Sequence, residues 1–437
     1  MPIAQNASPR CLRACWVFPV TGPPLRDAAV TIFQGRIIAV GNPPDDVPIE
    51  DLGHAAIVPG LINTHTHLEF SDLPSPIGCP GIELVEWLRC LIQRRAHAPL
   101  LSRSSIERGL QESVRQGVTT IGEIAQPGGT KDAYLASPCG GTLFLELIAP
   151  RIERLEAAME AAQKHLLDVG QWQTVGWAER APTRSVGRRV PSESSWQPGL
   201  SPHAPYTVHP ELLARAVDLS VEQGIPLAMH LAESREEIDF LRNGRGPFRE
   251  LLESRDAWDS TARPHGARPL DELRVLSRAH RALIVHGNYL DDEEINFLGR
   301  QRSRMAVVYC PRTHAWFGHA RYPLEKLLAA GAIVALGTDS RASSPDLSLL
   351  AEMRHVAREF PAMSRATILE LGTRSGARAL GFDSQIGTLE PGKWANLAVV
   401  ALPEDAATDP HELLLDAAGG VVATWIHGQR TLLWPVS

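Results

Sequence analysis

Short apolar runs rich in β-branched residues alternate with helical patterns through the middle of the chain. We expect strands at 56–65, 117–125, 141–149, 198–204, 225–230, 281–286, 304–310 and 332–339. Apolar positions spaced three and four residues apart predict helices between several of these runs. These helices cover 151–168, 210–223, 291–301 and 323–331. Eight strand–helix units predict a parallel (β/α)8 barrel of the TIM type.

The two ends of the chain have a different pattern. A pair of β-rich runs covers 28–41, where Gln34-Gly35 is typical of a hairpin turn, and similar runs return after Gly387. We therefore predict an α/β protein in which both termini build a small β-sandwich-like domain. The expected boundaries are 1–57 with 386–437 for this composite domain and 58–385 for the barrel.

Two stretches interrupt the alternation. Residues 180–199 are rich in Arg, Ser and Pro, and residues 243–269 read as an inserted helix with its loops. Long loops that follow barrel strands often shape a substrate pocket, so we expect these stretches near the functional end of the barrel.

Composition narrows the class of protein. The 437 residues are 44% hydrophobic and 21% charged, which is ordinary for a soluble globular chain. A net charge of −7 argues against nucleic acid or an anionic membrane as partner. Six cysteines without a CxxC pair give no disulfide framework or thiolate zinc site, so we expect a cytoplasmic protein. A homo-oligomer stays open.

Polar residues able to bind a metal or a proton follow five of the eight predicted strands. They are His65 and His67, then His203, then His230 and Glu233, then His286, and finally Asp339. Barrel enzymes carry their chemistry at the carboxyl ends of the strands. This placement favours an active site over a purely structural barrel.

Three imidazoles and one carboxylate among these residues suit a metal. His65 and His67, two residues apart on a strand, project to one face. With His230 and Asp339 they would form a site for Zn²⁺ or Fe²⁺. Each residue alone also has a structural explanation, such as a hydrogen-bonded core histidine or, for Asp339, a helix N-cap. The combination favours the metal site.

Five segments carry a resemblance to a known family. In chain order they are PGLINTHTHLE, SPHAPYT, HLAE, VHGNYL and LGTDS, followed by GTLEPGKWANL. They resemble the amidohydrolase superfamily. More narrowly, they are similar to its aminohydrolases of aromatic bases: S-adenosylhomocysteine/methylthioadenosine, guanine and aminodeoxyfutalosine deaminases and the triazine hydrolases.

The resemblance implies roles for the clustered residues. One divalent metal per chain, Zn²⁺ first with Fe²⁺ or Mn²⁺ as alternatives, would be held by His65, His67, His230 and Asp339. Glu233 would be the proton shuttle, His286 would orient the hydroxide, and Asp339 would accept a second proton. No lysine lies between 165 and 325, so a carboxylated lysine cannot bridge two metals from strand four.

These roles predict hydrolytic deamination of a heteroaromatic amine. A metal-bound hydroxide, available because the metal lowers the pKa of water to about 7, would attack the ring carbon and release ammonia. Glu233 would carry the water proton to a ring nitrogen.

The expected substrate is a 6-aminopurine nucleoside, with aminodeoxyfutalosine first. S-adenosylhomocysteine/methylthioadenosine, guanine or a triazine-type ring are alternatives, and a catalytically dead barrel used as a binding scaffold is the non-enzyme alternative. The predicted substrate contacts are His203, Glu69 and His314. A substrate carboxylate would meet one arginine among Arg89, Arg94, Arg95, Arg184, Arg188 and Arg189.

Overall fold

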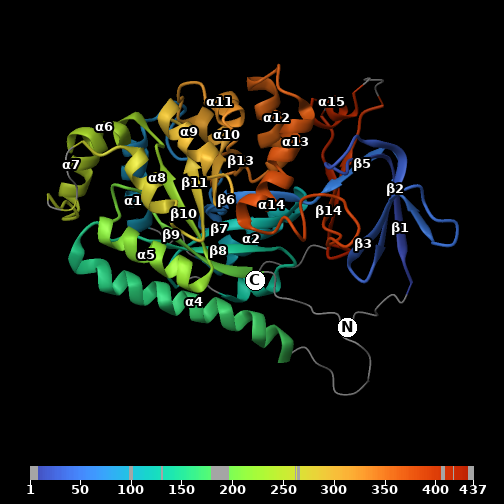
Figure 1. The fold of residues 1–437 in the computed structure, drawn as a ribbon, viewed down its shortest axis with the longest axis horizontal. Coiled ribbons are helices and arrows are strands. Elements are labelled where there is room, and N and C mark those ends of the chain that lie inside the picture. The colour runs from blue at the N-terminus through green and yellow to red at the C-terminus, as the bar shows by residue number, and fades with distance from the viewer. Residues whose placement is uncertain are drawn as a thin grey trace.

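The computed structural model describes the chain in segments: 8–97, 102–128, 131–178, 196–260, 262, 266–404, 409–416 and 418–431. Two eight-stranded sheets organise these residues. In Figure 1 the barrel fills the centre and left of the view, and the sheet from the termini, blue and red, stands at the right.

One sheet is the barrel. Its strands run in the order β13-β12-β11-β10-β9-β8-β7-β6, with every neighbouring pair parallel. Their bounds are β6 (Leu61–Thr66), β7 (Val118–Ala125), β8 (Gly140–Leu147), β9 (Trp196–Pro202), β10 (Pro226–Leu231), β11 (Arg281–His286), β12 (Met305–Tyr309) and β13 (Ile333–Leu336). A parallel bridge between Thr66 and Asp339 nearly closes the ring. The predicted (β/α)8 barrel is confirmed.

Both faces of the barrel strands are buried, as expected of a parallel sheet covered by helices. Within β11, Leu283 and Val285 belong to the core inside the barrel, whereas Ile284 packs outward against the helices. The alternation explains why these strands read as nearly continuous apolar runs in the sequence.

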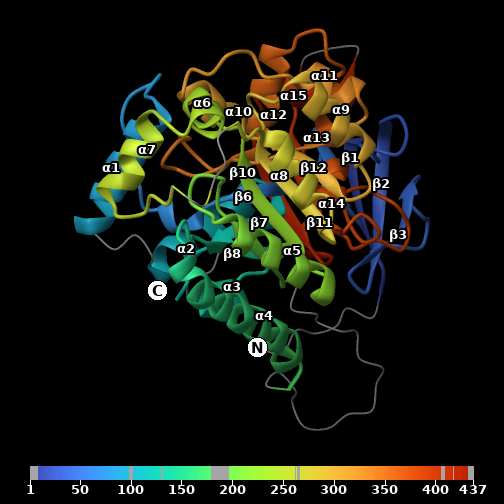
Figure 2. The same cartoon turned by 60° about the vertical axis from the view of Figure 1, so that its left-hand side comes forward.

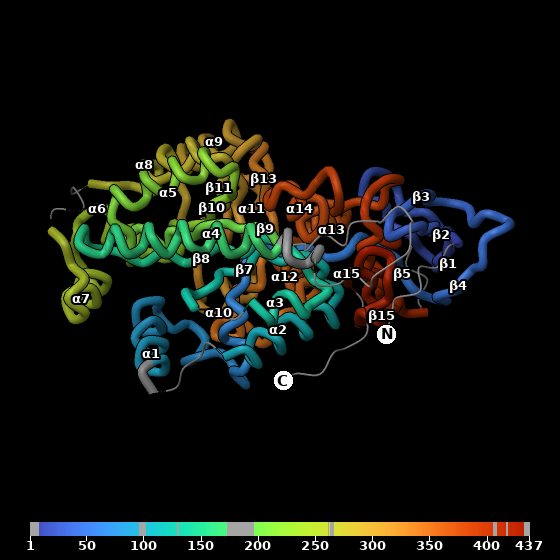
Figure 3. The backbone as a smooth tube through the Cα atoms, turned by 90° about the horizontal axis from the view of Figure 1, so that it is seen from below, coloured from blue at the N-terminus to red at the C-terminus, as the bar shows by residue number. Residues whose placement is uncertain are grey.

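Helices surround the barrel. Their bounds are α1 (Leu84–His97), α2 (Arg103–Arg115), α3 (Lys131–Ala136), α4 (Leu155–Ala178), α5 (Pro210–Gln223), α6 (Arg235–Asn243), α7 (Pro247–Ser254), α8 (Pro269–Leu276), α9 (Asp292–Arg300), α10 (Pro311–Trp316), α11 (Leu324–Ala329), α12 (Leu349–Glu359), α13 (Arg365–Leu371), α14 (Arg374–Leu380) and α15 (Pro410–Leu415), with short 3₁₀ turns η1 (Leu68–Phe70) and η2 (Ile152–Arg154). Figure 3 shows α4 lying along α5, where Arg215 pairs with Glu156 at 2.6 Å.

The second sheet joins the two ends of the chain. Its bounds are β1 (Arg10–Val17), β2 (Leu25–Phe33), β3 (Arg36–Gly41), β4 (Ile49–Asp51), β5 (Ala55–Pro59), β14 (Leu397–Ala401), β15 (Val421–Ile426) and β16 (Gln429–Arg430). Gln34 and Gly35 have φ of 49° and 79°, the left-handed pair that a tight type I′ hairpin needs. A bridge between Arg36 and Trp394 brings the edge strand β3 back toward the chain entering β14.

One expected strand is divided between the two sheets. The run predicted at 56–65 becomes β5 in the terminal sheet and β6 in the barrel. Gly60 lies between them and its N–H donates to the Asn396 carbonyl at 2.7 Å. The domain boundaries drawn from the sequence stay a prediction.

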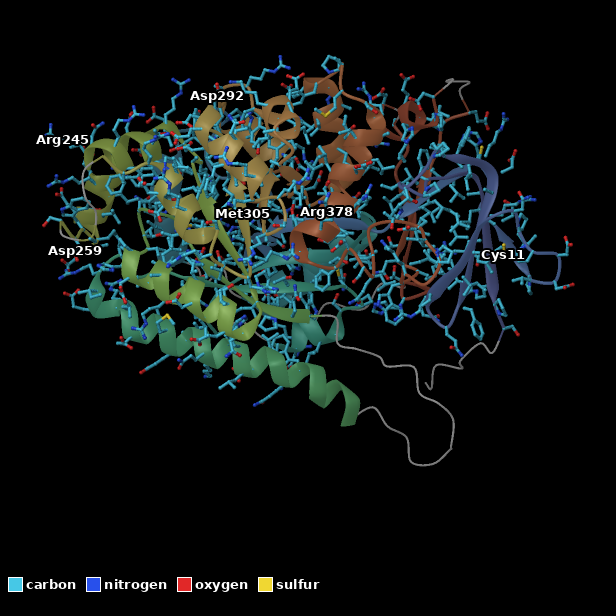
Figure 4. The ribbon with its side chains drawn as sticks, in the orientation of Figure 1. Cys11, Arg245, Asp259, Asp292, Met305 and Arg378 are labelled. Atoms are coloured by element: carbon cyan, nitrogen blue, oxygen red, sulfur yellow. The ribbon has the colours of Figure 1, made fainter. Side chains whose placement is uncertain are left out.

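The functional end of the barrel faces away from the terminal sheet. Figure 4 labels Arg245 and Asp259, which flank α7, at the opposite end of the molecule from Cys11 of β1. In Figure 2 helices α1 and α7 lie side by side, and Arg89 of α1 approaches Glu250 of α7 at 3.7 Å. Within the described segments no helix has the length and apolarity needed to cross a membrane.

Candidate active site

Six of the seven residues predicted at the strand ends lie close together in the structure. Nε2 of His65 lies 3.6 Å from Oδ1 of Asp339, and Nε2 of His67 lies 3.8 Å from the same oxygen. His230 completes the group, with its ring centroid 4.9 Å from that of His65 and 5.5 Å from that of His67. The structure therefore brings the four expected ligands together.

His286 and Glu233 adjoin this group. The His286 ring centroid lies 5.4 Å from that of His230, and its Nε2 lies 3.4 Å from Oε1 of Glu233. Ligand atoms of His65, His230 and His286 lie within 4.8 Å of one another, as do those of His65, His67 and Asp339. Two overlapping triads of possible ligands thus share His65.

The donor set fits a divalent cation. Both ring nitrogens of His65 and Nδ1 of His67 are buried without a hydrogen-bond partner in the part of the chain that is described. Leaving buried polar atoms unpaired is costly, and a cation among the rings would satisfy nitrogens that no protein donor or acceptor reaches. Three imidazoles and a carboxylate are ordinary ligands of Zn²⁺.

Burial also keeps these imidazoles in the neutral form that binds metals. It lowers the pKa of His65 and of His67 well below 6.5, and neighbouring imidazoles lower both further. The pKa of His230 falls to about 4, again chiefly because of burial. Neutral rings have a lone pair free for coordination.

Outer hydrogen bonds orient two of the expected ligands. Nδ1 of His230 lies 2.9 Å from the His203 carbonyl, which can only accept, so Nδ1 carries the proton and Nε2 is free. The Ser343 hydroxyl donates to Oδ2 of Asp339 at 2.7 Å, which leaves Oδ1 directed toward the histidines.

Left-handed backbone occurs at three strand ends around the cluster. Ala232, His286 and Asp339 have φ of 54°, 69° and 55°, which non-glycine residues rarely adopt. At His286 the change breaks the alternation of β11, which would otherwise direct this side chain outward with Ile284. Such strain persists where the surrounding structure over-determines it and is common at functional sites.

A side-chain clamp holds the turn that carries Glu233. The N–H groups of Ala232 and Glu233 each donate to a carboxylate oxygen of Glu237 at 2.8 Å. Asn288 Nδ2 donates to the Glu233 carbonyl at 2.8 Å. Sequence reasoning missed Glu237 and Asn288; the only local signal was a glutamate four residues after Glu233.

Glu233 is a buried carboxyl whose surroundings favour its protonated form. Burial raises the pKa of its carboxyl well above 4.5, and the Asp339 carboxylate raises it further. A raised pKa brings a carboxyl group closer to the range that general acid–base chemistry uses.

A cavity of about 350 Å³ opens onto the cluster. His67, His230, Glu233, His286 and Asp339 form its floor. One wall is apolar and comes from α1 and α7, through Leu84, Trp87, Leu88, Leu91, Ile92, Leu251 and Leu252. The site can therefore receive a small molecule that extends from the cluster along an apolar surface.

The three predicted substrate contacts occupy different positions. His203 lines the cavity, and its Nδ1 lies 2.6 Å from the Thr207 hydroxyl. Glu69 is buried beside the cavity, where Arg95 donates to it at 2.6 Å. His314 does not line the cavity; its ring packs against Tyr309 and Tyr322.

Among the described residues, three arginines line the cavity, and the sequence indicated one of them. Arg95 was among the candidates, but it is paired with Glu69. Arg154 and Arg255 were not considered, and neither forms an ion pair with any residue for which the structure gives a position. Arg89 and Arg94 are outside the lining, and Arg184, Arg188 and Arg189 lie outside the described residues.

Comparison with known proteins gives related chains over nearly the whole length. The chain is 29% identical to a 5-methylthioadenosine/S-adenosylhomocysteine deaminase of Moorella thermoacetica, with 97% of this chain and 93% of the relative covered. It is 28% identical to an aminodeoxyfutalosine deaminase of Deinococcus radiodurans, with 80% and 81% covered.

A solved structure has the same fold. The zinc-bound adenosine deaminase of Xanthomonas campestris superposes with a TM-score of 0.76 at 24% identity, covering 97% of this chain and 93% of that one. The model of the amidohydrolase family matches residues 56–431, which include every residue of the cluster. The chain belongs to the amidohydrolase family and is a hydrolase that acts on carbon–nitrogen bonds.

Proposed function

We propose that the protein is a metal-dependent hydrolytic deaminase of a 6-aminopurine nucleoside, with aminodeoxyfutalosine as the first expected substrate. The observation that carries the proposal is the cluster of His65, His67, His230 and Asp339 beside Glu233, on the floor of one cavity. The deaminases named among the relatives support the same class of reaction.

His65, His67, His230 and Asp339 would hold one divalent cation. Zn²⁺ is the first expected ion, because the ligand set suits it and the Xanthomonas campestris structure contains it. When bound, the cation would supply hydroxide at neutral pH by lowering the pKa of a water ligand to about 7.

The protein's own residues would handle the protons. Glu233 would take the proton of the attacking water and deliver it to a ring nitrogen, because its carboxyl lies beside the candidate metal ligands at the cavity surface. His286, 3.4 Å from Glu233, would orient the attacking oxygen. Asp339 would accept the second proton and pass it to the departing ammonia.

The cavity favours a substrate with an acidic group at its far end. Arg154 and Arg255 line the cavity and pair with no carboxylate among the residues that the structure describes, and a guanidinium pairs well with a carboxylate. Aminodeoxyfutalosine has a benzoate, whose ring would lie on the apolar wall of α1. S-adenosylhomocysteine also has a carboxylate and is the second candidate. Methylthioadenosine and guanine have none.

Product analysis across a substrate panel tests the proposal. The zinc-loaded protein would be given aminodeoxyfutalosine, S-adenosylhomocysteine, methylthioadenosine, adenosine, guanine and a chlorotriazine, with ammonia and chloride both measured. We expect the fastest ammonia release from one of the two carboxylate-bearing nucleosides. Chloride release alone would place the protein with the triazine-type hydrolases. No turnover of any of the six would contradict the proposed function.

A further inference from the structure

Glu146 is an acidic residue of the cavity wall that the proposed reaction does not use. It is the penultimate residue of β8, its side chain is 4% exposed, and it lines the same cavity as His203 and His230. No arginine or lysine with a described position pairs with it. A buried carboxylate without a cationic partner is costly unless hydrogen-bond donors satisfy it.

One oxygen of Glu146 is already held by the protein. Gln126 Nε2 donates to Oε2 at 2.6 Å, which fixes the orientation of the carboxylate. The other oxygen, Oε1, lies 3.9 Å from Nε2 of His203, beyond a direct hydrogen bond. Oε1 therefore has unused acceptor capacity at the cavity surface.

The position of Oε1 of Glu146 indicates which part of a bound substrate would lie near it. His203 is close both to Glu146 and to the candidate metal ligands: its Nε2 lies 3.9 Å from Oε1 of Glu146, and its ring centroid lies 5.0 Å from that of His230. A bound purine whose amino carbon is at the cluster would therefore have its far side near Glu146.

A carboxylate can only accept hydrogen bonds, so the substrate group that meets it must be a donor. In a 6-aminopurine nucleoside, N1, N3 and N7 are acceptors, N9 carries the ribose, and the one amino group is at the reacting carbon. The remaining donors of a nucleoside are the ribose hydroxyls. We infer that Glu146 binds the ribose hydroxyls and selects ribonucleosides over deoxynucleosides, an inference that rests on the proposed deaminase function.

Glu69 is the competing residue, because the sequence indicated it for the same contact. Its Oε1 receives the Arg95 guanidinium at 2.6 Å and it does not line the cavity. A carboxylate already paired with an arginine has less need of a substrate donor. The geometry thus assigns the contact to Glu146 and gives a matched comparison, Glu69→Gln.

One experiment varies both the ribose hydroxyls of the substrate and the carboxylate residues of the protein. Zinc-loaded wild-type protein, Glu146→Gln and Glu69→Gln would be assayed with adenosine and with 2′-deoxy-, 3′-deoxy- and 2′,3′-dideoxyadenosine. We expect wild type to prefer adenosine over the dideoxy compound by about 10- to 100-fold in kcat/KM, the range of one or two charge-assisted hydrogen bonds. The preference should disappear in Glu146→Gln and persist in Glu69→Gln.

Calorimetric binding of inosine and 2′,3′-dideoxyinosine to the same three proteins separates this inference from the proposed function. If no nucleoside is deaminated but inosine binds more tightly than its dideoxy analogue only while Glu146 is present, the deaminase function fails and the role of Glu146 stands. Equal binding of the two compounds by wild type, binding of neither, or a preference that survives in Glu146→Gln would overturn the inference.

Discussion

Nε2 of His286 lies 3.4 Å from Oε1 of Glu233, although the two residues end different strands of the barrel. The backbone of each residue is fixed. The N–H of Glu233 donates to the Glu237 carboxylate, and His286 has a left-handed φ of 69°. The proposed proton shuttle and the proposed orienting group therefore face each other before any substrate arrives.

Removing the acidity of Glu233 tests its role. We expect Glu233→Gln to lower kcat by about 10²- to 10⁴-fold, the usual contribution of a general acid–base group. Metal content should stay at the wild-type level, because Glu233 is outside the expected ligand set. Glu236→Gln, the same substitution at a partly exposed glutamate in the first turn of α6, is the control and should stay within about threefold of wild type. A Glu233→Gln protein within about tenfold of wild type would remove Glu233 from the mechanism.

The ligand set is tested by metal analysis rather than by activity. Wild type loaded with Zn²⁺ should retain about one ion per chain after dialysis, the stoichiometry of a single four-ligand site. His65→Ala and Asp339→Ala should each lose most of that ion. His54→Ala removes an exposed histidine of the terminal sheet and should leave the metal content unchanged. Full occupancy in either ligand variant would require a different set.

Arg154 and Arg255 should matter only for substrates with an acidic group. We expect Arg154→Gln and Arg255→Gln to raise KM for aminodeoxyfutalosine about 10-fold or more, because a charge-assisted hydrogen bond is lost. KM for methylthioadenosine should change less than about twofold. Arg94→Gln, an exposed arginine of α1 outside the cavity lining, is the matched control. Equal effects on both substrates would show that the arginines do not bind the acid.

The sequence was sufficient to predict the barrel and to group the candidate metal ligands. Each strand is a short apolar run, and the polar residue that follows it falls at the one end of a parallel barrel where all such residues converge. For this reason His65, His230 and Asp339 could be grouped across more than 270 residues of chain. The sequence did not indicate the division at Gly60, because the apolar run of β5 continues through Gly60 into the first two residues of β6.

Other parts of the site left no readable pattern. Glu237 acts through the backbone of Ala232 and Glu233, and such contacts depend on how the turn folds rather than on residue type. Arg154 and Arg255 come from separate loops about 100 residues apart, so no spacing relates them. In the sequence, nothing distinguishes Glu146 from other strand residues. Only the structure shows that it lines the cavity.

His319 provides a test of how stability depends on pH. In the sequence it lies far from the expected metal ligands. Burial, together with the nearby His314, lowers the pKa of His319 to about 3; the Tyr289 hydroxyl lies 3.1 Å from its Nδ1. As pH falls below 6.5 the unfolded chain takes up a proton that folded His319 does not, so wild type loses stability. His319→Asn lacks this loss.

Thermal unfolding of wild type and His319→Asn checks the sign. Relative to wild type, the variant should gain about 2 kcal/mol between about pH 7.5 and about pH 5. A stability difference between the two proteins that is the same at both pH values would contradict the assignment.

The central claim is that the histidine–aspartate cluster binds a metal and hydrolyses an aromatic carbon–nitrogen bond. The most direct measurement is ammonia release from aminodeoxyfutalosine and S-adenosylhomocysteine by one protein preparation before chelation, after chelation and after reloading with Zn²⁺. We expect ammonia release that disappears with the metal and returns with about one ion per chain. Release that is unaffected by chelation, or its absence from the fully loaded protein with both nucleosides, would contradict the claim.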